Sequence, residues 1–342
     1  MATYYVREQG AVVRKQDERL VVTKDRAIVA EIPMHQLDQL VVMGNIQLTT
    51  PAVGILLQSE VDVVFMTIHG RVRGRLMANE SKFAELRLKQ LQMMTNEQAN
   101  LAVAKPIVAA KLANQRALLQ RESRAAAVEA AARGIAEMIT RALKAENADS
   151  LRGFEGKAGA WYWPAFKTLL KRDLGFAGRN YYPPKDPVNA LLSFGYALLQ
   201  RDLMAAVQLV GLDPYLGFFH TVQYGRPSLA LDLMEEFRPL LVDPMVLDLI
   251  DRAGMGAQDF RRGSEGEKPL LLREESVKRV IQAYEERVTS KVRYPMTGEE
   301  TTYRRCFELQ TRQMARVIKG EAAEYKAMMN AESHSASASG TL

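Results

Sequence analysis

The sequence is poor in the two residue types that most often hold structural zinc. Among its 342 residues, Cys306 is the single cysteine, and there are four histidines. A lone cysteine can form neither an intramolecular disulfide nor a thiolate cluster, and so few histidines argue against a multi-histidine zinc site. No run approaches eighteen apolar residues, and the first residues lack an apolar signal core behind a basic head. We therefore expect a cytoplasmic protein with no transmembrane helix.

Several catalytic signatures are missing as well. The chain has no P-loop ending in Gly-Lys-Ser/Thr, no Gly-x-Gly-x-x-Gly, no Gly-x-Ser-x-Gly and no His-Glu-x-x-His. These absences argue against P-loop nucleotide hydrolases, dinucleotide-dependent enzymes, α/β-hydrolases and zinc proteases of the His-Glu-x-x-His class.

Acidic residues are sparse in one long stretch. The net charge of the whole chain is +6 and its pI is about 9.3, which mildly favours a polyanionic partner. Between Arg71 and Lys144 there are fourteen Lys/Arg and six Glu, with no Asp. A solvated helix surface and a DNA-binding surface both account for such a run, so charge alone does not decide between them.

Hydrophobic patterning divides the chain into two parts. The first part has one short helix, with Thr50 as its N-cap, and short runs rich in valine and isoleucine at residues 11–14, 19–23, 27–32 and 61–68. Beyond residues 79–81 the β-branched runs largely disappear, and Ser81 can cap the first of several helices. Further helices are expected at residues 101–124, 125–146, 187–210, 228–237, 277–287 and 301–330.

These patterns predict an α+β fold with two domains, in agreement with the length of the chain. A small, mostly antiparallel N-terminal β domain is expected over residues 1–78. A larger all-α domain is expected over residues 81–330. The tail at residues 331–342 alternates Ser and Ala and lacks apolar anchors, so it is predicted to be disordered.

Glu155 is the first candidate for chemistry, because it is a single carboxylate among Gly153, Gly156 and Gly159. Each glycine costs a helix about 1 kcal/mol relative to alanine. Several so close together indicate that another backbone or a ligand approaches closely. A tight helix–helix crossing with an incidental exposed glutamate explains the pattern equally well. Tyr162 follows seven residues later, on the same helical face.

His220 is the second candidate, although a histidine after two phenylalanines is most often a half-buried, hydrogen-bonded residue. The helix that follows places Asp232, Glu235 and Glu236 on one arc of about 100°. Such like-charged neighbours cost a helix a few tenths of a kcal/mol each, which an acidic solvated face tolerates and a bound cation would reverse. Carboxylates with one imidazole suit Mg²⁺ or Mn²⁺.

Four segments, in this order and spacing, carry a resemblance to a known family. They are Leu-Arg-Gly-Phe-Glu-Gly-Lys-Ala (151–158), Pro-Pro-Lys-Asp-Pro-Val-Asn-Ala-Leu-Leu-Ser-Phe-Gly-Tyr (183–196), Gly-Leu-Asp-Pro-Tyr-Leu-Gly-Phe-Phe-His (211–220) and Gly-Arg-Pro-Ser-Leu-Ala-Leu-Asp-Leu-Met-Glu-Glu-Phe-Arg-Pro (225–239). With them, the sequence resembles the CRISPR-associated adaptation endonuclease, the integrase that inserts new spacers into CRISPR arrays. The resemblance covers nearly the whole chain.

The resemblance implies that Glu155, His220 and Glu235 are catalytic and hold a divalent metal, Mg²⁺ or Mn²⁺. It implies that the domain at residues 81–330 carries catalysis, while residues 1–78 form a homodimer. It also suggests supporting or hydrogen-bonding roles for Asp232, Tyr162 and Asn189. It further suggests that Arg226 contacts DNA.

The implied reaction is the attack of a 3′-hydroxyl of incoming DNA on a phosphodiester of the array. The implied partners are double-stranded DNA (the incoming fragment and the CRISPR repeat) and a small ferredoxin-like adaptation protein. A general DNA-repair nuclease and a non-catalytic DNA-binding scaffold are the competing interpretations. An adjacent repeat array in the genome would separate the integrase from the general nuclease.

Overall fold

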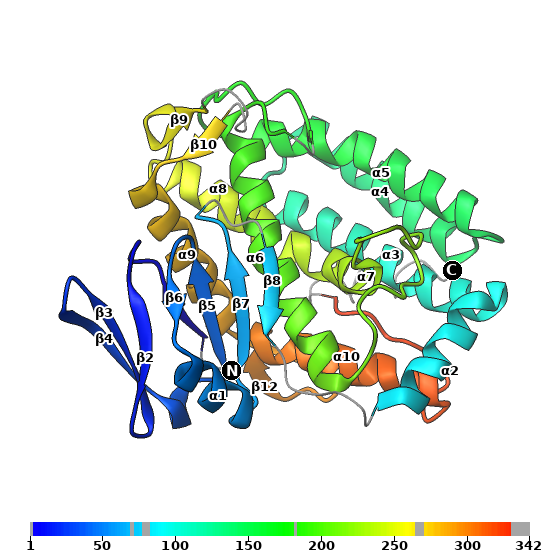
Figure 1. The fold of residues 1–342 in the computed structure, drawn as a ribbon. Helices are drawn as coiled ribbons and strands as arrows, with labels where there is room; N and C mark the ends of the chain where they lie inside the picture. Colours follow the sequence, from blue (N-terminus) through cyan, green and yellow to red (C-terminus); the bar gives the residue numbers. More distant parts are fainter. Residues whose placement is uncertain (1–2, 69–71, 77–82, 181–182, 264–269, 330–342) are drawn as a thin grey trace. The chain divides into compact units, whose positions relative to one another are not determined.

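The computed structural model describes the chain except residues 1–2, 69–71, 77–82, 181–182, 264–269 and 330–342 (Figure 1). It divides into two compact units, Met1–Lys82 (unit 1) and Phe83–Leu342 (unit 2). Ser81, expected to cap a helix, and the tail expected to be disordered lie outside the described residues.

Unit 1 holds two four-stranded sheets among its described residues, with the orders β1-β5-β7-β8 and β4-β3-β2-β6 (Figure 1). The short helix α1 (Thr50–Gln58) starts one residue after its N-cap, Thr49. The strands are β1 (Thr3–Val6), β2 (Val12–Gln16), β3 (Arg19–Lys24), β4 (Ala27–Pro33), β5 (Gln39–Met43), β6 (Gln47–Leu48), β7 (Asp62–Met66) and β8 (Val72–Leu76).

The α+β class is confirmed, since strands come first and the remainder is mostly helical. Strand pairing in unit 1, however, is mixed rather than mostly antiparallel. Three described pairings are parallel (β1–β5, β5–β7, β2–β6) and three are antiparallel (β2–β3, β3–β4, β7–β8). For β5 and β7 the reason is that α1 carries the chain back between them, so these two strands run in the same direction.

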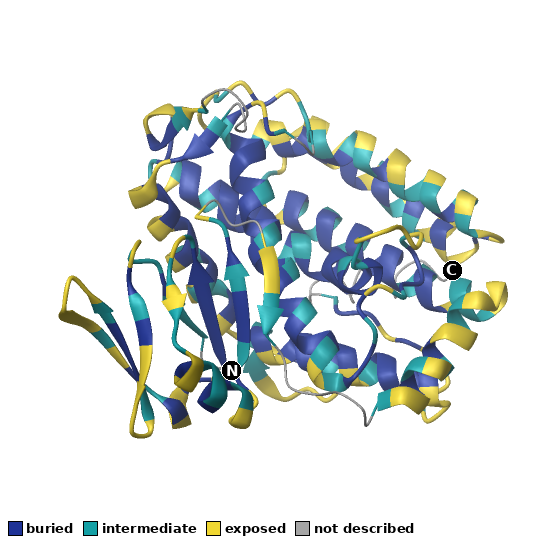
Figure 2. Cartoon of the chain, viewed as in Figure 1, coloured by how far each residue is buried: buried dark blue, intermediate teal, exposed yellow. Residues whose placement is uncertain are grey.

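Strand β5 lies in the middle of its sheet and is buried along its whole length (Figure 2). Its sequence, Gln-Leu-Val-Val-Met, is a nearly continuous apolar run, as expected for a strand covered on both faces. Leu40 of β5 joins Val6, Leu20, Leu56 and Val63 in an apolar core in which each is fully buried. Burial of such side chains stabilises the unit by about 1.5–3 kcal/mol each.

The described residues of unit 2 form helices and two small two-stranded sheets, so the domain predicted to be all-α also contains strands. The strands are β9 (Phe260–Arg262), β10 (Leu270–Leu272), β11 (Lys291–Arg293) and β12 (Glu300–Thr302). The helices are α2 (Ala84–Thr95), α3 (Glu97–Glu122), α4 (Ala126–Leu143), α5 (Ala148–Leu169), α6 (Pro187–Val210), α7 (Ser228–Phe237), the π-helical turn Arg238–Val242, α8 (Asp243–Asp251), α9 (Glu274–Thr289) and α10 (Tyr303–Lys319).

Helix α6 shows how local chemistry sets the ends of these helices. Asp186 is its N-cap and accepts a hydrogen bond from Asn189 N at 2.9 Å, and Pro187 takes the first helical position. Gly211 ends the helix with φ of 91°, a left-handed conformation that favours glycine.

Helix α3 lies centrally in unit 2, packed against α4, α5 and α7, and α7 also packs against α6 (Figure 1). Segments far apart in sequence therefore meet around α3. In the part of the chain that the structure describes, no helix is long and apolar enough to span a membrane.

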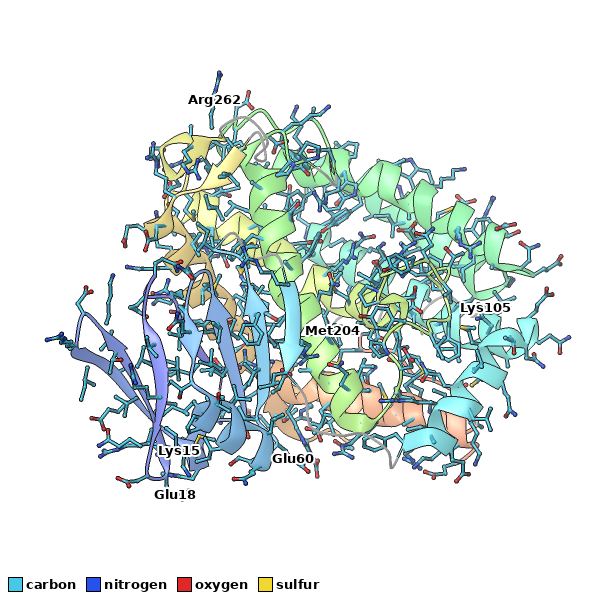
Figure 3. The ribbon with its side chains drawn as sticks, viewed as in Figure 1. Lys15, Glu18, Glu60, Lys105, Met204 and Arg262 are labelled. Atoms are coloured by element: carbon cyan, nitrogen blue, oxygen red, sulfur yellow. The ribbon has the colours of Figure 1, made fainter. Side chains whose placement is uncertain are left out.

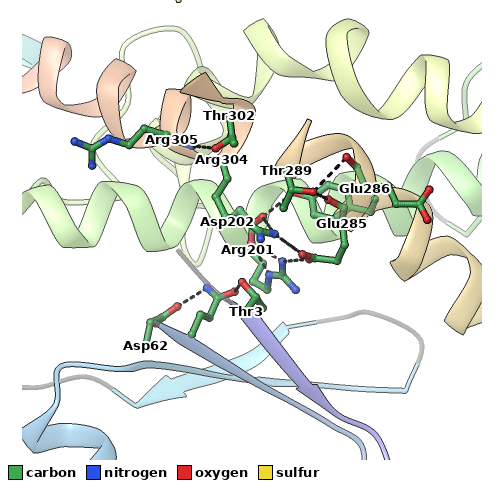
Figure 4. A network of polar contacts seen from close by, with 12 residues as sticks. Thr3, Asp62, Arg201, Asp202, Glu285, Glu286, Thr289, Thr302, Arg304 and Arg305 are labelled. Atoms are coloured by element: carbon green, nitrogen blue, oxygen red, sulfur yellow. Dashed lines mark hydrogen bonds and ion pairs between the residues drawn. The ribbon is translucent and has the colours of Figure 1, made fainter. Parts of the chain in front are cut away.

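A buried ion network joins α6, α9 and α10 (Figure 4). Asp202 accepts hydrogen bonds from Arg201 Nε at 2.8 Å and from Tyr284 OH at 2.9 Å. Arg304 Nη2 bridges Asp202 and Glu285, at 3.3 Å and 2.9 Å. Because each buried charge has a partner, the network fixes the packing of these helices without leaving an unpaired ion.

Candidate functional site

Glu155, Glu235 and His220 come from three separate segments of unit 2. Glu155 lies on α5 and Glu235 lies on α7, while His220 lies in the loop between α6 and α7, eight residues before Ser228. Helix α3 packs against both α5 and α7. Helix α3 contributes Lys111. Figure 3 labels Lys105, which lies six residues earlier on the same helix.

Lys111 links the two glutamates. Its ammonium Nζ donates a hydrogen bond to Glu155 Oε1 and lies 2.7 Å from Glu235 Oε2. The Lys111 side chain is 10% exposed and that of Glu235 is 2% exposed, so water screens their attraction only weakly. Burial alone would lower the pKa of Lys111, but Glu235 and Glu155 outweigh burial and raise it. The ammonium is therefore charged at any physiological pH.

Glu235 is ionised despite its burial. Burial raises its pKa, but Arg238 and Lys111 outweigh this effect and hold the pKa at about 2. Arg238 Nη2 lies 3.4 Å from Glu235 Oε1. Glu235 Oε2 accepts no hydrogen bond of ordinary geometry from the described residues, although Lys111 Nζ is close. Lys111 and Glu235 thus form a buried ion pair.

Asp232 orients His220. Its Oδ1 lies 2.7 Å from His220 Nδ1 and accepts the His220 backbone N–H at 2.9 Å. Its Oδ2 accepts the N–H groups of Phe218 and Phe219 at 2.6 and 3.0 Å. In a neutral imidazole, Nδ1–H donates to this carboxylate and leaves the Nε2 lone pair available, as in many metal-binding histidines. Nε2 lies 3.8 Å from Glu235 Oε1.

Gly217 makes this loop possible. A Cβ atom at Gly217 would lie 2.7 Å from Asp232 Oδ2 and 2.7 Å from Ser228 Cβ, closer than real Cβ contacts. The Ser228 hydroxyl donates to Thr221 O at 3.0 Å, on the other side of His220. The loop is therefore tied to α7 at both ends of the histidine.

The donor set fits a hard divalent cation. Glu155 and Glu235 meet at Lys111 Nζ, and His220 Nε2 points to the other oxygen of Glu235. Two carboxylates with one imidazole suit Mg²⁺ or Mn²⁺, and a cation would satisfy Glu235 Oε2. Among the described residues, no three His, Cys, Asp or Glu side chains are placed to hold an ion as they stand, and Lys111 contacts the same oxygens.

Tyr162 and Tyr196 both donate a hydrogen bond to the carboxylate of Asp243. The Tyr162 hydroxyl donates to Asp243 Oδ2 at 2.6 Å, and the Tyr196 hydroxyl donates to Oδ1 at 2.5 Å. Burial raises the pKa of Asp243 to about 6. The Arg238 guanidinium lies 4.7 Å from the centre of the Tyr196 ring, and it also faces Glu235. This chain of contacts positions Arg238 beside the glutamate.

Asn189 organises the segment before α6. Its Oδ1 accepts from Arg179 Nη1 and Asn180 N, both at 2.9 Å, and its Nδ2 donates to Gly178 O at 2.9 Å. Arg226 lies in the loop between His220 and α7, partly buried, and its backbone N–H donates to the loop at 3.1 Å.

Comparison of the whole sequence with known protein families identifies the family of this chain. Residues 4–286 match the model of a family described as CRISPR associated protein Cas1. The chain belongs to the Cas1 family. The resemblance inferred from the four segments is thereby confirmed.

Curated relatives of this Cas1 chain are named endonucleases, in agreement with the predicted class. It is 36% identical over 337 residues to CRISPR-associated endonuclease Cas1 2 of Rhodospirillum rubrum, covering 94% of this chain and 96% of the relative. It is 33% identical over 324 residues to endonuclease Cas1 3 of Thermus thermophilus, covering 94% and 95%. It is 36% identical over 332 residues to a Cas4/Cas1 fusion of Geobacter sulfurreducens, covering 94% of this chain and 59% of the fusion. The chain thus spans little more than half of such fusions.

Solved structures share the Cas1 fold. A Cas1 protein from Thermotoga maritima superposes with a TM-score of 0.78 at 24% identity, covering 93% of this chain and 97% of that one. A casposase bound to an integration product gives a TM-score of 0.81 at 22% identity, covering 96% and 93%. At such identities the likeness concerns the fold.

The glycines around Glu155 do not mark a tight helix crossing. A Cβ atom at Gly153, Gly156 or Gly159 would meet nothing within 4 Å. The close approach of α4 and α5 occurs instead at Gly134 of α4, where a Cβ atom would lie 2.6 Å from the Trp161 ring. The alternative that a ligand approaches these glycines stays a prediction.

Sequence reasoning missed Lys111 and Arg238. Lys111 stands in the apolar run Ile-Val-Ala-Ala-Lys-Leu, and a lone lysine in such a run is a signal of a buried ion pair. Arg238 stands in the quoted Glu-Glu-Phe-Arg-Pro motif, three residues after Glu235, where one helical turn brings two side chains together.

Proposed function

We propose that this protein is a divalent-metal-dependent DNA endonuclease and integrase that inserts new spacer DNA into CRISPR arrays. Membership of the Cas1 family supports the class of reaction. The observation that carries the proposal is the meeting of Glu155 and Glu235 at one cation, next to a histidine held by Asp232.

In this proposal Glu155, Glu235 and His220 Nε2 hold Mg²⁺ or Mn²⁺. The bound ion supplies Lewis-acid chemistry, which favours an alkoxide nucleophile and neutralises phosphate oxygens. Asp232 keeps the His220 imidazole in the tautomer that leaves Nε2 free. Arg238, fixed against Tyr196, places a second positive charge beside Glu235, where it can pair with a phosphate oxygen.

The reaction is the attack of a 3′-hydroxyl of the incoming fragment on a phosphodiester of the repeat. One ester bond forms and another breaks, so the number of phosphodiesters is unchanged and no external energy source is needed. Water in place of the 3′-hydroxyl gives hydrolysis, which accounts for endonuclease activity at the same site. The open helix surface at Gly153, Gly156 and Gly159 leaves room for a bulky DNA strand next to Glu155.

The proposed partners are double-stranded DNA, a second copy of this chain and a small ferredoxin-like adaptation protein. A partial Cas6-RT-Cas1–Cas2 complex resembles this chain with a TM-score of 0.66 at 25% identity, which supports the protein partner. Dimerisation through residues 1–78 is supported by β4, an edge strand with Ile28 and Val29 59% and 45% exposed.

Sedimentation of the full-length protein tests the dimer. We expect a dimer at micromolar concentration, and a monomer when Ile28 and Val29 are both replaced by aspartate. Lys15→Gln, at an exposed position of β2 inside the same sheet, serves as a control. A monomeric wild type would refute the arrangement, and an unimpaired dimer in the aspartate variant would place the interface elsewhere.

A strand-transfer assay tests the function itself. A labelled duplex with 3′-hydroxyl ends is offered either a CRISPR repeat flanked by its leader or an unrelated duplex of equal length, with Mg²⁺ or Mn²⁺. Joined product at the repeat supports the integrase. Cleavage of both duplexes without joining favours a general DNA-repair nuclease, and binding with no metal-dependent chemistry favours a DNA-binding scaffold.

A further inference from the structure

Lys111 is a buried cation at the very carboxylates proposed to hold the metal. It is 8% exposed as a residue and sits on the buried side of α3. Its Nζ contacts Glu155 of α5 and Glu235 of α7, so one ammonium joins three helices. A lysine stem carries several rotatable bonds, and its ammonium is a compact point charge whose position can change.

The charges around this point leave little room for a second cation beside Lys111. The carboxylates of Glu155 and Glu235 face Lys111, and Glu235 also faces Arg238. Asp232 is committed to the His220 loop. Arg238 is held against the Tyr196 ring. Lys111 is thus the cationic group that shares both glutamates, and a unit charge about 5 Å from a divalent ion opposes its binding by more than ten-fold even at the dielectric constant of water.

We propose that Lys111 is an internal counter-ion that competes with the divalent metal for Glu155 and Glu235. The ammonium forms ion pairs with both carboxylates and thereby holds α3, α5 and α7 together. A divalent ion binds the same oxygens only as Lys111 withdraws from between them. Lys111 therefore sets the concentration of metal at which the site fills. This inference rests on the proposed metal site.

Metal affinity, measured without DNA, tests the competition. Mn²⁺ binding to the full-length protein is titrated by electron paramagnetic resonance for the wild type, Lys111→Met and Lys111→Arg. Lys105→Met, on the same helix, is the matched control. We expect Lys111→Met to bind Mn²⁺ about ten-fold more tightly than the wild type. Lys111→Arg, which keeps the charge, and Lys105→Met should stay within about two-fold of the wild type.

Thermal unfolding of the same proteins keeps the inference testable if Lys111→Met is unstable. With chelator present, Lys111→Met should unfold at a lower temperature than the wild type, because the buried Glu235 and the partly buried Glu155 lose their counter-ion. Saturating Mn²⁺ should raise its unfolding temperature more than it raises that of the wild type. Equal affinities and equal Mn²⁺-induced shifts for the two proteins would overturn the inference. Absence of Mn²⁺ binding to both would overturn the proposed metal site as well.

Discussion

The two units bury polar groups to very different extents. In the described residues of unit 1, Gln39 is the single buried polar or charged side chain, whereas unit 2 buries nineteen. The core of unit 1 is made of Val, Leu, Ile, Ala and Met, whose burial stabilises without any partner. Unit 2 instead buries ions that must be paired to be tolerated.

The difference indicates where function constrains the fold. A buried charge is weak evidence for stability, because an apolar replacement of similar size is often neutral or stabilising. Polar burial in unit 2 is concentrated on α3, α6, α7 and α10, and it includes Lys111 and Glu235 at the candidate site. This contrast supports the proposal that unit 1 is a scaffold and that unit 2 carries the catalytic side chains. The predictions below test this contrast.

The largest expected effect is the loss of strand transfer in the ligand variants. Glu155→Gln, His220→Ala and Glu235→Gln should each lower the rate by at least about a hundred-fold, because each removes a proposed metal ligand. Rates are measured with saturating Mn²⁺, and circular dichroism checks the fold. Glu137→Gln, an exposed residue paired with Arg141 on α4, is the control and should be unaffected. Wild-type rates in any two ligand variants would break the assignment.

A smaller loss is expected for Asp232→Asn. An amide in this position cannot accept from both Nδ1 of His220 and the loop N–H groups, so the imidazole turns to the tautomer with hydrogen on Nε2. Mn²⁺ affinity should fall by about 10- to 100-fold. An affinity equal to that of the wild type would show that Asp232 shapes the loop without affecting the histidine.

The raised pKa of Asp243 predicts that the stability of the folded protein depends on pH. Burial raises the folded-state pKa of Asp243 from 3.8 to about 6. A carboxyl with a raised pKa contributes stability that is full below its unfolded pKa and is lost as the pH rises through the folded pKa. Between pH 4 and pH 8, the wild type should therefore lose about 2.5 kcal/mol of unfolding free energy relative to Asp243→Asn. Urea unfolding at both pH values measures this, and an equal change in both proteins would contradict it.

The smallest effect is expected for Arg226→Ala. A single phosphate contact contributes about one unit to the slope of log affinity against log salt. The variant should bind DNA with a slope about one unit shallower and with unchanged unfolding free energy. An unchanged slope and unchanged strand transfer would remove Arg226 from the DNA-binding surface.

Local chemistry explains which parts of the fold could be predicted. Helices α6 and α7 have the predicted bounds, because Asp186 with Pro187 and Gly211 mark the ends of α6 and Pro227 precedes α7. Helix α5 is missing from the predicted helix bounds, and its glycines weaken the local helical pattern. Packing of Trp161 against Gly134 stabilises it through tertiary contacts that the local sequence does not show.

The residues of the site could likewise be predicted only where a local sequence motif marks them. The motif resemblance names Glu155, His220 and Glu235, but their geometry depends on α3, which carries no motif. Lys111 could not be assigned from spacing, because its partners lie 44 and 124 residues away along the chain. The parallel pairing of β1 with β5 was missed for the same reason, as strand order is a long-range property.

The central claim is that Glu155, His220 and Glu235 hold one divalent ion, and its most direct test is pulsed electron paramagnetic resonance of the Mn²⁺-loaded protein. We expect a coupling from one imidazole nitrogen in the wild type. The coupling should vanish in His220→Ala and persist in His35→Ala, an exposed histidine of unit 1. A wild-type spectrum without nitrogen coupling, or one unchanged in His220→Ala, would contradict the account.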